Sequence, residues 1–366
     1  MIESKKIVLT IIGTRPEIIK MSPLIPLLDE SFSHLLVHTG QHYSANMDEV
    51  FFEELNLRRP DYAFECGGLS PVEQVATIMT KLDAILQKEK VEAVLVHGDT
   101  NTTLAGALTG AKYKSNGLKV IHVEAGCRSH NLLQAEEINR LVVDRVSDYM
   151  FVPTIGDAKN LVNEGYSEDK FEVTGNTVVD SCVRTAESTD PSSILLEYGL
   201  STRDYALLTM HRQETVDSLD NLRSMISTID KISETIKIVF PIHPRTQKMM
   251  NEFDIIFESK NVEVIEPIGY LKMINLLKES AFCLTDSGGL QEEAATLRVP
   301  TIVLRNETEY MHYVREGILF LSGISSEKII EISTKLFAMK NNSRVIDVEG
   351  NGSTLKILNK LKSLIL

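Results

Sequence analysis

The feature that most constrains the fold is a repeated alternation of short apolar runs, rich in β-branched residues, with longer amphipathic segments. Near-continuous apolar runs are typical of parallel strands that are covered on both faces. Alternating strands and helices predict α/β domains built on parallel sheets. The runs in the first half of the chain are 6–12, 35–39, 93–96, 120–124, 149–152 and 171–174. Those in the second half are 206–210, 236–242, 262–265, 282–285, 301–304 and 318–321.

Six candidate strands in each half predict two Rossmann-like domains, and a length of 366 residues is more than one hydrophobic core usually serves. We expect an N-terminal domain over 1–176 and a C-terminal domain over 177–352. The tail, 353–366, has the pattern of an amphipathic helix, and we expect it to complete the N-terminal domain. Helical periodicity is also clear in 47–55, 72–86, 218–229 and 271–277.

Charge and cysteine content exclude several classes of protein. A net charge of −13 argues against nucleic-acid binding, which needs a basic face, but permits a local cationic pocket for a nucleotide. No apolar stretch approaches the roughly 20 residues that a membrane-spanning helix requires, so we expect no membrane partner. The four cysteines are widely spaced without a CxxC pair, which predicts reduced thiols in a cytoplasmic protein. His122, Glu124, Cys127 and His130 follow no zinc-ligand spacing, so no metal site is expected.

Polar motifs follow seven of the candidate strands. Ligands of parallel sheets bind outside the carboxyl ends of the strands, and both halves contribute motifs, which predicts a site in the cleft between two domains. The motifs are GTRPEIIK (13–20), TGQHY (39–43), HGDTNTT (97–103), HVEAGCRS (122–129), MHRQET (210–215), PIHPR (241–245) and TDSGGLQEEA (285–294).

The motif TDSGGLQEEA predicts a turn that binds a diphosphate. Ser287 can cap a helix that begins near Leu290, while Gly288 and Gly289 let the backbone N–H groups approach an anion. Glu292 and Glu293 would lie in the first turn of that helix. They either complement the helix dipole or, for Glu293, accept hydrogen bonds from a ribose.

The motif GTRPEIIK predicts a second strand–turn–helix unit. Gly13 would form the turn and Pro16 would take the first helical position. Arg15 and Lys20 could then stabilise a phosphate leaving group. The alternative is a surface lysine and an Arg15 that is paired with Glu17.

Three acidic side chains in the first half are candidates for acid–base chemistry. Asp99 follows a strand directly and is either exposed to the cleft or the N-cap of the next helix. Glu124 ends an apolar strand, where a buried carboxylate needs a partner or a function. Glu136 and Arg140 have the i,i+4 spacing of an ordinary ion pair, which by itself favours a structural role.

Two histidine–arginine pairs end neighbouring strands in the second half. They are His211 with Arg212, and His243 with Arg245. A single histidine at a strand end is usually structural, but two such pairs favour the binding of an anion.

Together these motifs resemble the non-hydrolysing UDP-N-acetylglucosamine 2-epimerases, in order from residue 5 to about 310. The resemblance implies the two-domain glycosyltransferase-B architecture and a reversible C2 epimerisation through anti elimination of UDP. It implies UDP and a UDP-2-acetamido sugar as ligands, no nicotinamide cofactor or metal, and a homodimer. It assigns catalysis to Asp99, Glu124, Glu136 and His211, which replaces the structural reading of Glu136. It assigns substrate binding to Arg15, Lys20, Arg140, His243, Arg245, Tyr270, Ser287, Gly288, Gly289, Glu293 and Arg305.

The sequence departs from the family pattern in several places. Ala135 stands where proline is usual, Cys127 where leucine is usual, and Tyr310 and Met311 where an Arg-Pro pair is usual. The last change leaves open a modified sugar, such as a 2,3-diacetamido-glucuronate or a 6-deoxy sugar. Gln41 and His42 resemble part of a regulatory UDP-sugar site. A glycosyltransferase of the same fold and a hydrolysing epimerase remain alternative functions.

Overall fold

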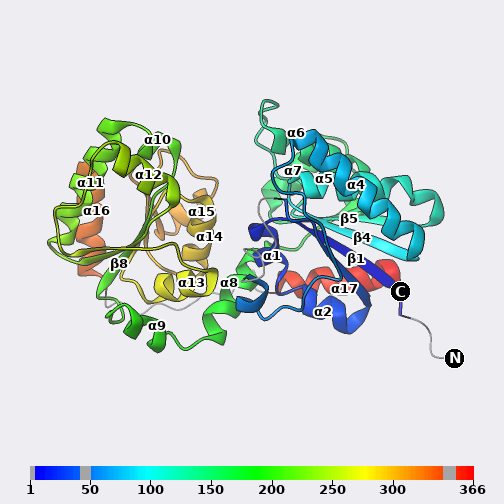
Figure 1. The fold of residues 1–366 in the computed structure, drawn as a ribbon, viewed down its shortest axis with the longest axis horizontal. Helices are drawn as coiled ribbons and strands as arrows, with labels where there is room; N and C mark the ends of the chain where they lie inside the picture. The colour runs from blue at the N-terminus through cyan, green and yellow to red at the C-terminus, as the bar shows by residue number, and fades with distance from the viewer. Residues whose placement is uncertain (1–4, 42–50, 341–351) are drawn as a thin grey trace. The chain divides into compact units, whose positions relative to one another are not determined.

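The computed structural model describes residues 5–41, 51–340 and 352–366, and Figure 1 shows their arrangement in ribbon form. The chain divides into two compact units, one of residues 1–181 with 350–366 and one of residues 182–349. The chain passes from the first unit to the second inside helix α8 (Thr177–Ser188), not ahead of it.

The first unit is built on a parallel sheet of seven strands in the order β3-β2-β1-β4-β5-β6-β7. The strands are β1 (Ile7–Ile12), β2 (Ser33–His38), β3 (Tyr62–Ala63), β4 (Val91–His97), β5 (Lys119–Val123), β6 (Tyr149–Val152) and β7 (Phe171–Val173). The central strands β1, β4 and β5 are mostly apolar and almost completely buried, as expected for parallel strands that helices cover on both faces.

Helices α4, α5 and α6 lie on one side of this sheet, and α2 and α17 lie on the other (Figure 1). The core on the first side includes Ile11, Val94 and Val96 of the sheet, packed with Leu82 and Ala105 of the helices. The helices are α1 (Arg15–Met21), α2 (Ile25–Ser31), α4 (Pro71–Lys88), α5 (Asn101–Lys112), α6 (Ala135–Val146), α7 (Ile155–Asn163) and α17 (Ser353–Ile365). Two 3-10 turns, η1 (Lys114–Asn116) and η2 (Glu168–Lys170), precede β5 and β7.

The second unit is built on a parallel sheet of six strands in the order β10-β9-β8-β11-β12-β13. The strands are β8 (Tyr205–Thr209), β9 (Lys237–Pro241), β10 (Val262–Ile265), β11 (Cys283–Thr285), β12 (Thr301–Val303) and β13 (Leu319–Leu321). The helices are α9 (Ser192–Glu197), α10 (Gln213–Val216), α11 (Leu219–Ser233), α12 (Pro244–Glu252), α13 (Tyr270–Glu279), α14 (Gly288–Thr296), α15 (Met311–Arg315) and α16 (Ser326–Ala338). Leu208, Phe240 and Leu284 of the sheet form its core with Ile226 and Ile329 of α11 and α16.

The predicted α/β class with two parallel sheets is confirmed, and every predicted strand is present within a residue or two of its expected ends. The prediction missed β3, which has only two residues. The helical segments 72–86, 218–229 and 271–277 lie in α4, α11 and α13. Residues 51–54 of the predicted helix 47–55 are helical, whereas 47–50, with His42 and Tyr43 of the motif TGQHY, lie outside the described residues.

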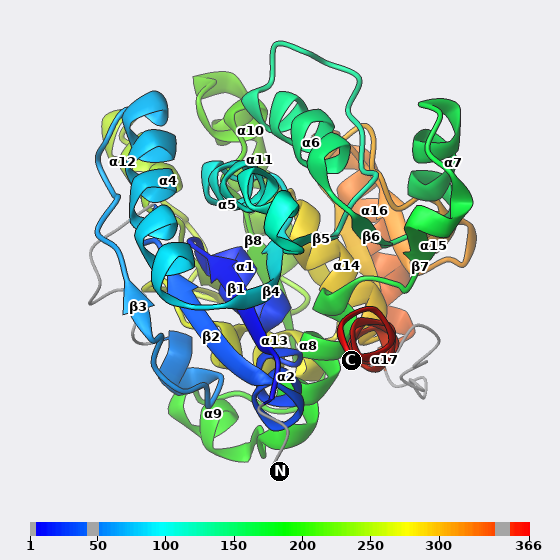
Figure 2. The same cartoon turned by 90° about the vertical axis from the view of Figure 1, so that its right-hand side faces the viewer.

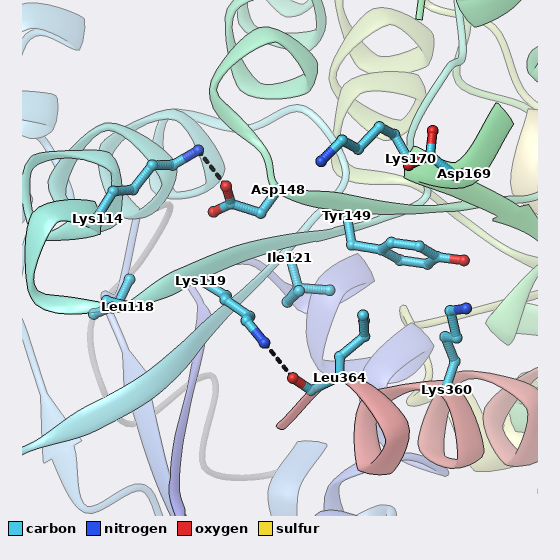
Figure 3. Close-up of a pocket in the computed structure, with 11 residues that line it drawn as sticks. Lys114, Leu118, Lys119, Ile121, Asp148, Tyr149, Asp169, Lys170, Lys360 and Leu364 are labelled. Carbon is cyan, nitrogen blue, oxygen red and sulfur yellow. Dashed lines mark hydrogen bonds and ion pairs between the residues drawn. The ribbon is translucent and has the colours of Figure 1, made fainter. Parts of the chain in front are cut away.

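A pocket of about 470 Å³ opens at the amino ends of β5, β6 and β7, beside α17 (Figure 3). Lys119 donates a hydrogen bond to the carbonyl oxygen of Leu364 there, and the ammonium of Lys360 lies 4.9 Å from the centre of the Tyr149 ring. Because all strands of the sheet are parallel, the pocket is at the opposite edge from the polar motifs. Its contacts attach α17 to the sheet.

The start of α17, which Figure 2 shows almost end-on, depends on a carboxylate from another helix. Asp180 of α8 accepts hydrogen bonds from the backbone N of Gly352 at 2.8 Å and of Thr354 at 2.7 Å. It also accepts one from the hydroxyl of Thr354 at 2.7 Å, and it is only 6% exposed. Asp180 thus satisfies N–H groups that have no partner within their own helix.

We predict that Asp180→Ala lowers the free energy of unfolding by about 2 kcal/mol, because buried N–H groups lose a charged acceptor. Urea unfolding followed by circular dichroism measures the change. Glu331→Ala is the control, since its ion pair with Lys335 is fully exposed and its loss should leave the unfolding midpoint almost unchanged. Equal unfolding midpoints for Asp180→Ala and the unsubstituted protein would contradict this role of Asp180.

Candidate functional site

In the first unit, the turns that follow β1 and β4 are joined by the buried carboxylate of Glu17. One oxygen accepts hydrogen bonds from the backbone N of Gly13 at 2.7 Å and of Thr14 at 2.8 Å. The other accepts from the hydroxyls of Thr100 at 2.8 Å and Thr103 at 3.2 Å. Burial raises the pKa of Glu17 above its ordinary value, although these hydrogen bonds and the nearby His97 oppose it. Glu17 therefore fixes one turn against the other.

Glycine is required at position 13 because the side chains of Thr39 and Thr102 lie very close to its backbone. A Cβ atom at this position would lie 2.0 Å from Oγ1 of Thr39 and 2.2 Å from Oγ1 of Thr102. The turn after β1 is consequently packed directly against the start of α5. Pro16 is the second residue of α1, since the helix begins at Arg15.

Glu124 follows β5 in a left-handed conformation, with φ of 68°, which is strained for a residue with a side chain. Both of its carboxylate oxygens contact Nζ of Lys20, at 2.6 and 2.8 Å, and Nε2 of His97 lies 3.3 Å away. Burial by itself raises the pKa of Glu124, but Lys20 and His97 outweigh it and hold the pKa well below the usual range. Glu124 is therefore an ionised, partly exposed carboxylate.

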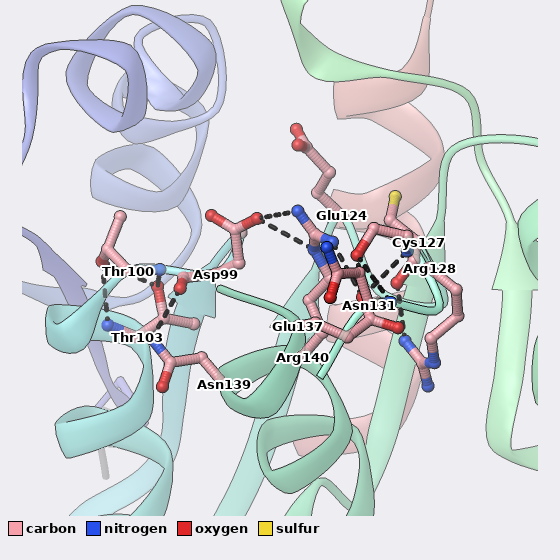
Figure 4. A network of polar contacts seen from close by, with 12 residues as sticks. Asp99, Thr100, Thr103, Glu124, Cys127, Arg128, Asn131, Glu137, Asn139 and Arg140 are labelled. Atoms are coloured by element: carbon pink, nitrogen blue, oxygen red, sulfur yellow. Dashed lines mark hydrogen bonds and ion pairs between the residues drawn. The ribbon is translucent and has the colours of Figure 1, made fainter. Parts of the chain in front are cut away.

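Asp99 is held by Arg140 of α6, and not by a helix N-terminus (Figure 4). Oδ2 of Asp99 lies 2.6 Å from Nη2 and 2.9 Å from Nε of Arg140. Thr100, one residue later, is the N-cap of α5. The structure thereby rejects the capping alternative for Asp99 and leaves its carboxylate at the carboxyl end of β4.

Arg140 pairs with Glu137, and not with Glu136 as the i,i+4 spacing suggested. Nη1 of Arg140 lies 2.9 Å from Oε2 of Glu137. Glu137 is 1% exposed and also accepts hydrogen bonds from the backbone N of Ser129 and of His130, both at 2.9 Å. Burial raises the pKa of Glu137, but these hydrogen bonds and Arg140 together lower it by a larger amount, so the net shift is downward. Glu136 itself is exposed near the start of α6.

Arg15 is exposed, and its guanidinium lies 5.4 Å from the centre of the Phe51 ring. The alternative pairing of Arg15 with Glu17 does not describe this structure, because the carboxylate of Glu17 is buried among backbone and hydroxyl donors. Gln41 is buried as well, and its side-chain oxygen accepts hydrogen bonds from the backbone and hydroxyl of Thr102.

In the second unit, the buried carboxylate of Asp286 organises the turn after β8. It accepts hydrogen bonds from the backbone N of His211 at 2.8 Å and of Arg212 at 2.7 Å. Its other oxygen lies 3.1 Å from Nδ1 of His211, whose side chain is about one-third exposed. The rings of His211 and His243 are 5.1 Å apart, so the two strand-end histidines are neighbours.

The turn at Ser287 has the form that the sequence predicted for an anion site. Ser287 caps α14 by accepting a hydrogen bond from the backbone N of Leu290. A Cβ atom added at Gly288 or Gly289 would meet no described atom within 4 Å, so a ligand can approach the backbone closely. The helix begins at Gly288, which places Glu292 and Glu293 in its second turn and not in its first. The alternative in which these two carboxylates complement the helix dipole from the first turn does not describe this structure.

The remaining predicted binding residues of the second unit differ in their surroundings. Arg245 makes a two-point ion pair with Asp217, with nitrogen–oxygen distances of 2.5 and 2.9 Å. Nδ1 of His243 accepts a hydrogen bond from the backbone of Arg245. Tyr270 is buried as the first residue of α13. Arg305 lies 3.4 Å from Glu309 at the end of β12.

Tyr310, which departs from the family pattern, donates a hydrogen bond to Oε2 of the buried Glu292 at 3.1 Å. Thr308 beside it donates one to the side chain of Gln291 at 2.6 Å. The segment after β12 is thus tied to α14, the helix that begins with the glycine turn.

Sequence reasoning missed four buried carboxylates that hold these turns, namely Glu17, Glu137, Asp144 and Asp286. A T-x-x-E spacing at Thr14 and Glu17 is the pattern of a capping box and could have identified Glu17. Glu137 stands at i,i+3 spacing from Arg140, but its contacts with Ser129 and His130, like the contacts of Asp144 and Asp286, are brought together only by the fold.

Among the described residues, no group of histidine, cysteine and acidic side chains could hold a metal ion. The four cysteines are free thiols. None of the helices in the described part of the chain is long and apolar enough to cross a membrane.

Comparison with known proteins gives matches over almost the whole chain. Residues 28–356 match the family described as UDP-N-acetylglucosamine 2-epimerase. The UDP-N-acetylglucosamine 2-epimerase of Methanococcus maripaludis is 41% identical over 356 residues, which cover 95% of this chain and 96% of that protein. The UDP-2,3-diacetamido-2,3-dideoxy-D-glucuronate 2-epimerase of Pseudomonas aeruginosa is 38% identical over 88% of this chain and 90% of its own length.

A solved structure shares the fold. The crystal structure of Methanocaldococcus jannaschii UDP-GlcNAc 2-epimerase in complex with UDP-GlcNAc and UDP superposes with a TM-score of 0.80. It is 41% identical and covers 98% of this chain and 99% of that one.

We predict that Lys20→Met raises the pKa of Glu124, because burial then becomes the dominant influence on that carboxyl group. Carbon-detected NMR of the glutamate carboxyl groups during a pH titration measures the change. Lys6→Met, which removes a more exposed partner of Glu92, should leave the titration of Glu124 unaltered. A Glu124 titration that is the same with and without Lys20 would refute the assigned cause.

Proposed function

Because the chain belongs to the UDP-N-acetylglucosamine 2-epimerase family, we propose that it reversibly inverts C2 of UDP-N-acetylglucosamine to give UDP-N-acetylmannosamine. The observation that carries the proposal is the chemistry at the strand ends. The first unit presents Asp99 and Glu124, each held by a cation, and the second presents an open glycine turn at a helix N-terminus. Acid–base groups and an anion-binding turn are what this reaction needs.

The proposed reaction is an elimination followed by an addition. The C2 proton of the sugar is not next to a carbonyl group, so removing it alone is very unfavourable. We propose that a base takes this proton while the bond between C1 and the diphosphate oxygen breaks, which gives UDP and a 2-acetamidoglucal. UDP then adds back to C1 as a proton is delivered to the opposite face of C2. Proton transfer needs positioned acids and bases, and the departing diphosphate needs cations and N–H donors.

We assign the proton transfers to Asp99, Glu124, Glu136 and His211. Asp99 and Glu124 are partly exposed at neighbouring strand ends, and Glu136 is exposed on α6. The carboxylate of Asp286, 3.1 Å from Nδ1 of His211, orients that ring. Their participation is a proposal that rests on position and on the family.

Lys20 connects binding to catalysis in this proposal. In the free protein the ammonium of Lys20 forms an ion pair with Glu124 and lowers its pKa, which makes that carboxylate a weak base. If Lys20 transfers its contact to the departing diphosphate, the pKa of Glu124 rises and the carboxylate becomes a better proton acceptor. One cation would then assist the leaving group and activate a base in the same step.

We assign the diphosphate to Ser287, Gly288 and Gly289, and the ribose to Glu293. Arg15, Tyr270, His243 and Arg305 complete the proposed substrate-binding set. Arg140 would act through Asp99, which it holds, and Arg245 would have to release Asp217 before it could bind an anion.

A second substrate is supported by the Pseudomonas aeruginosa relative, whose name specifies a 2,3-diacetamido-2,3-dideoxy-glucuronate. The departure at Tyr310 and Met311 adjoins α14, so it can alter sugar selection. Comparison of kcat/KM for the two nucleotide sugars decides between them.

We further propose that the protein forms a homodimer. Because all four cysteine thiols are free, we also propose a cytoplasmic location.

We predict that turnover of UDP-N-acetylglucosamine in heavy water, without any acceptor, places deuterium at C2 of the product. The reason is that the elimination exchanges the C2 proton with a group in contact with solvent. Proton NMR at C1 and C2 measures the incorporation. Unlabelled epimer would contradict the elimination, and accumulation of free UDP with N-acetylmannosamine would indicate a hydrolysing enzyme.

We predict that Asp99→Asn and His211→Ala each lower kcat by about 10²-fold or more, the usual effect of losing an acid–base group. The coupled assay of epimer formation measures kcat. Glu331→Gln, an exposed change on α16, should retain full activity. Near-normal kcat in both of the first two variants would refute the assignment of the site.

A further inference from the structure

We propose that Asp144 and His122 form a positioning pair that holds the turns of Asp99 and Glu124, with both ring nitrogens of His122 protonated. The pair lies in the first unit and touches none of the proposed substrate-binding residues. The catalytic part of this inference rests on the proposed function, whereas the protonation and the geometry do not.

The first branch of the pair reaches the turn that carries Asp99. Asp144 of α6 and the side chain of His122 in β5 are both completely buried. Nδ1 of His122 lies 2.6 Å from Oδ1 of Asp144, and Nε2 lies 2.8 Å from the carbonyl oxygen of Gly98. Gly98 has φ of 67° and immediately precedes Asp99. The hydrogen bond from His122 to the carbonyl oxygen of Gly98 therefore fixes the backbone from which the Asp99 side chain extends.

The second branch reaches the turn that carries Glu124. Oδ2 of Asp144 accepts a hydrogen bond from the backbone N of Gly126 at 3.2 Å and lies 2.7 Å from Nη2 of Arg128. Glu124 and Gly126 both have positive φ, and a Cβ atom at Gly126 would lie 2.8 Å from the carbonyl oxygen of Asp157. A strained turn persists only when its surroundings fix it, and Asp144 is a buried group that does so.

The hydrogen-bond partners determine the protonation of His122. The carbonyl oxygen of Gly98 can only accept, so Nε2 must carry a proton. Asp144 already accepts from the backbone N of Gly126 and lies 2.7 Å from the guanidinium of Arg128, a permanent cation that stabilises the ionised carboxylate. Asp144 is therefore an ionised acceptor, and Nδ1 must carry a proton as well. Arg128 also pairs with Glu164 at 2.7 Å, so a continuous chain of ion pairs runs from Glu164 through Arg128 and Asp144 to His122.

The first unit contains a second buried histidine–aspartate pair, His34 with Asp29, which contacts neither the turn of Asp99 nor that of Glu124. The side chain of His34 in β2 is also completely buried, with Nδ1 2.6 Å from Asp29 and Nε2 2.9 Å from the hydroxyl of Thr10. Its partners belong to α2 and β1 and adjoin neither turn. Replacing His34 therefore measures the cost of losing a buried histidine without disturbing Asp99 or Glu124.

The test compares His122→Gln and Asp144→Asn with His34→Gln in the full chain. The two donors of glutamine share one nitrogen atom, which cannot reach Asp144 and the carbonyl oxygen of Gly98 together. His122→Gln should therefore shift the backbone amide resonances of 98–100 and 124–126, whereas His34→Gln should not. With UDP-N-acetylglucosamine, His122→Gln should lower kcat about 10²-fold, as expected for misplaced catalytic groups. Its KM should change far less, and His34→Gln should stay within about twofold of the unsubstituted kcat.

Nitrogen-15 NMR of the unsubstituted protein provides the independent measurement. Both ring nitrogens of His122 should show an attached proton, and Asp144→Asn should remove one of them. An unprotonated ring nitrogen in the unsubstituted protein would overturn the proposed charge state. Unchanged amide resonances in His122→Gln, or equal losses of kcat in His122→Gln and His34→Gln, would overturn the positioning role. An unsubstituted protein without epimerase activity, but with the expected resonances, would refute only the proposed function.

Discussion

The structure depends on buried carboxylates that accept backbone N–H groups from the turns at the carboxyl ends of parallel strands. A strand that ends in a turn leaves N–H groups without ladder partners, and such groups must be satisfied if they are buried. A carboxyl group offers two oxygen atoms, each of which can accept more than one hydrogen bond. Glu17 holds Gly13 and Thr14, Glu137 holds Ser129 and His130, and Asp286 holds His211 and Arg212.

This constraint separates the acidic residues into two groups. Glu17, Glu137, Asp144 and Asp286 are almost completely buried and bind several backbone or side-chain donors each. Asp99 and Glu124 are partly exposed, and cationic side chains, Arg140 and Lys20, make their main contacts. Because the first group fixes the turns, the second can face solvent with defined positions. A binding or proton-transfer role is therefore open to Asp99 and Glu124, whereas the buried carboxylates act by positioning.

The sequence predicted the strands well because parallel strands with covered faces are continuous apolar runs, as in 149–152, where all four residues are buried and the ends match. It missed β3 because two residues carry no periodicity. The partners of charged side chains were harder to predict. Arg140 has Glu136 at helical spacing but binds Asp99, which is distant in the chain and is brought close only by the fold. Ser287 was predicted as the cap of α14, but the start of the helix was expected near Leu290. Because the helix begins at Gly288, Glu292 and Glu293 lie in its second turn.

We propose that epimerisation breaks the bond between C1 of the sugar and the bridging oxygen of the diphosphate. The most direct measurement uses UDP-N-acetylglucosamine with oxygen-18 in that bridge and follows the label by phosphorus NMR. Our account predicts that the label moves into the non-bridging oxygens of the terminal phosphate as the epimer forms, because this phosphate can rotate while it is detached. Epimer that retains all of the label in the bridge would contradict the account.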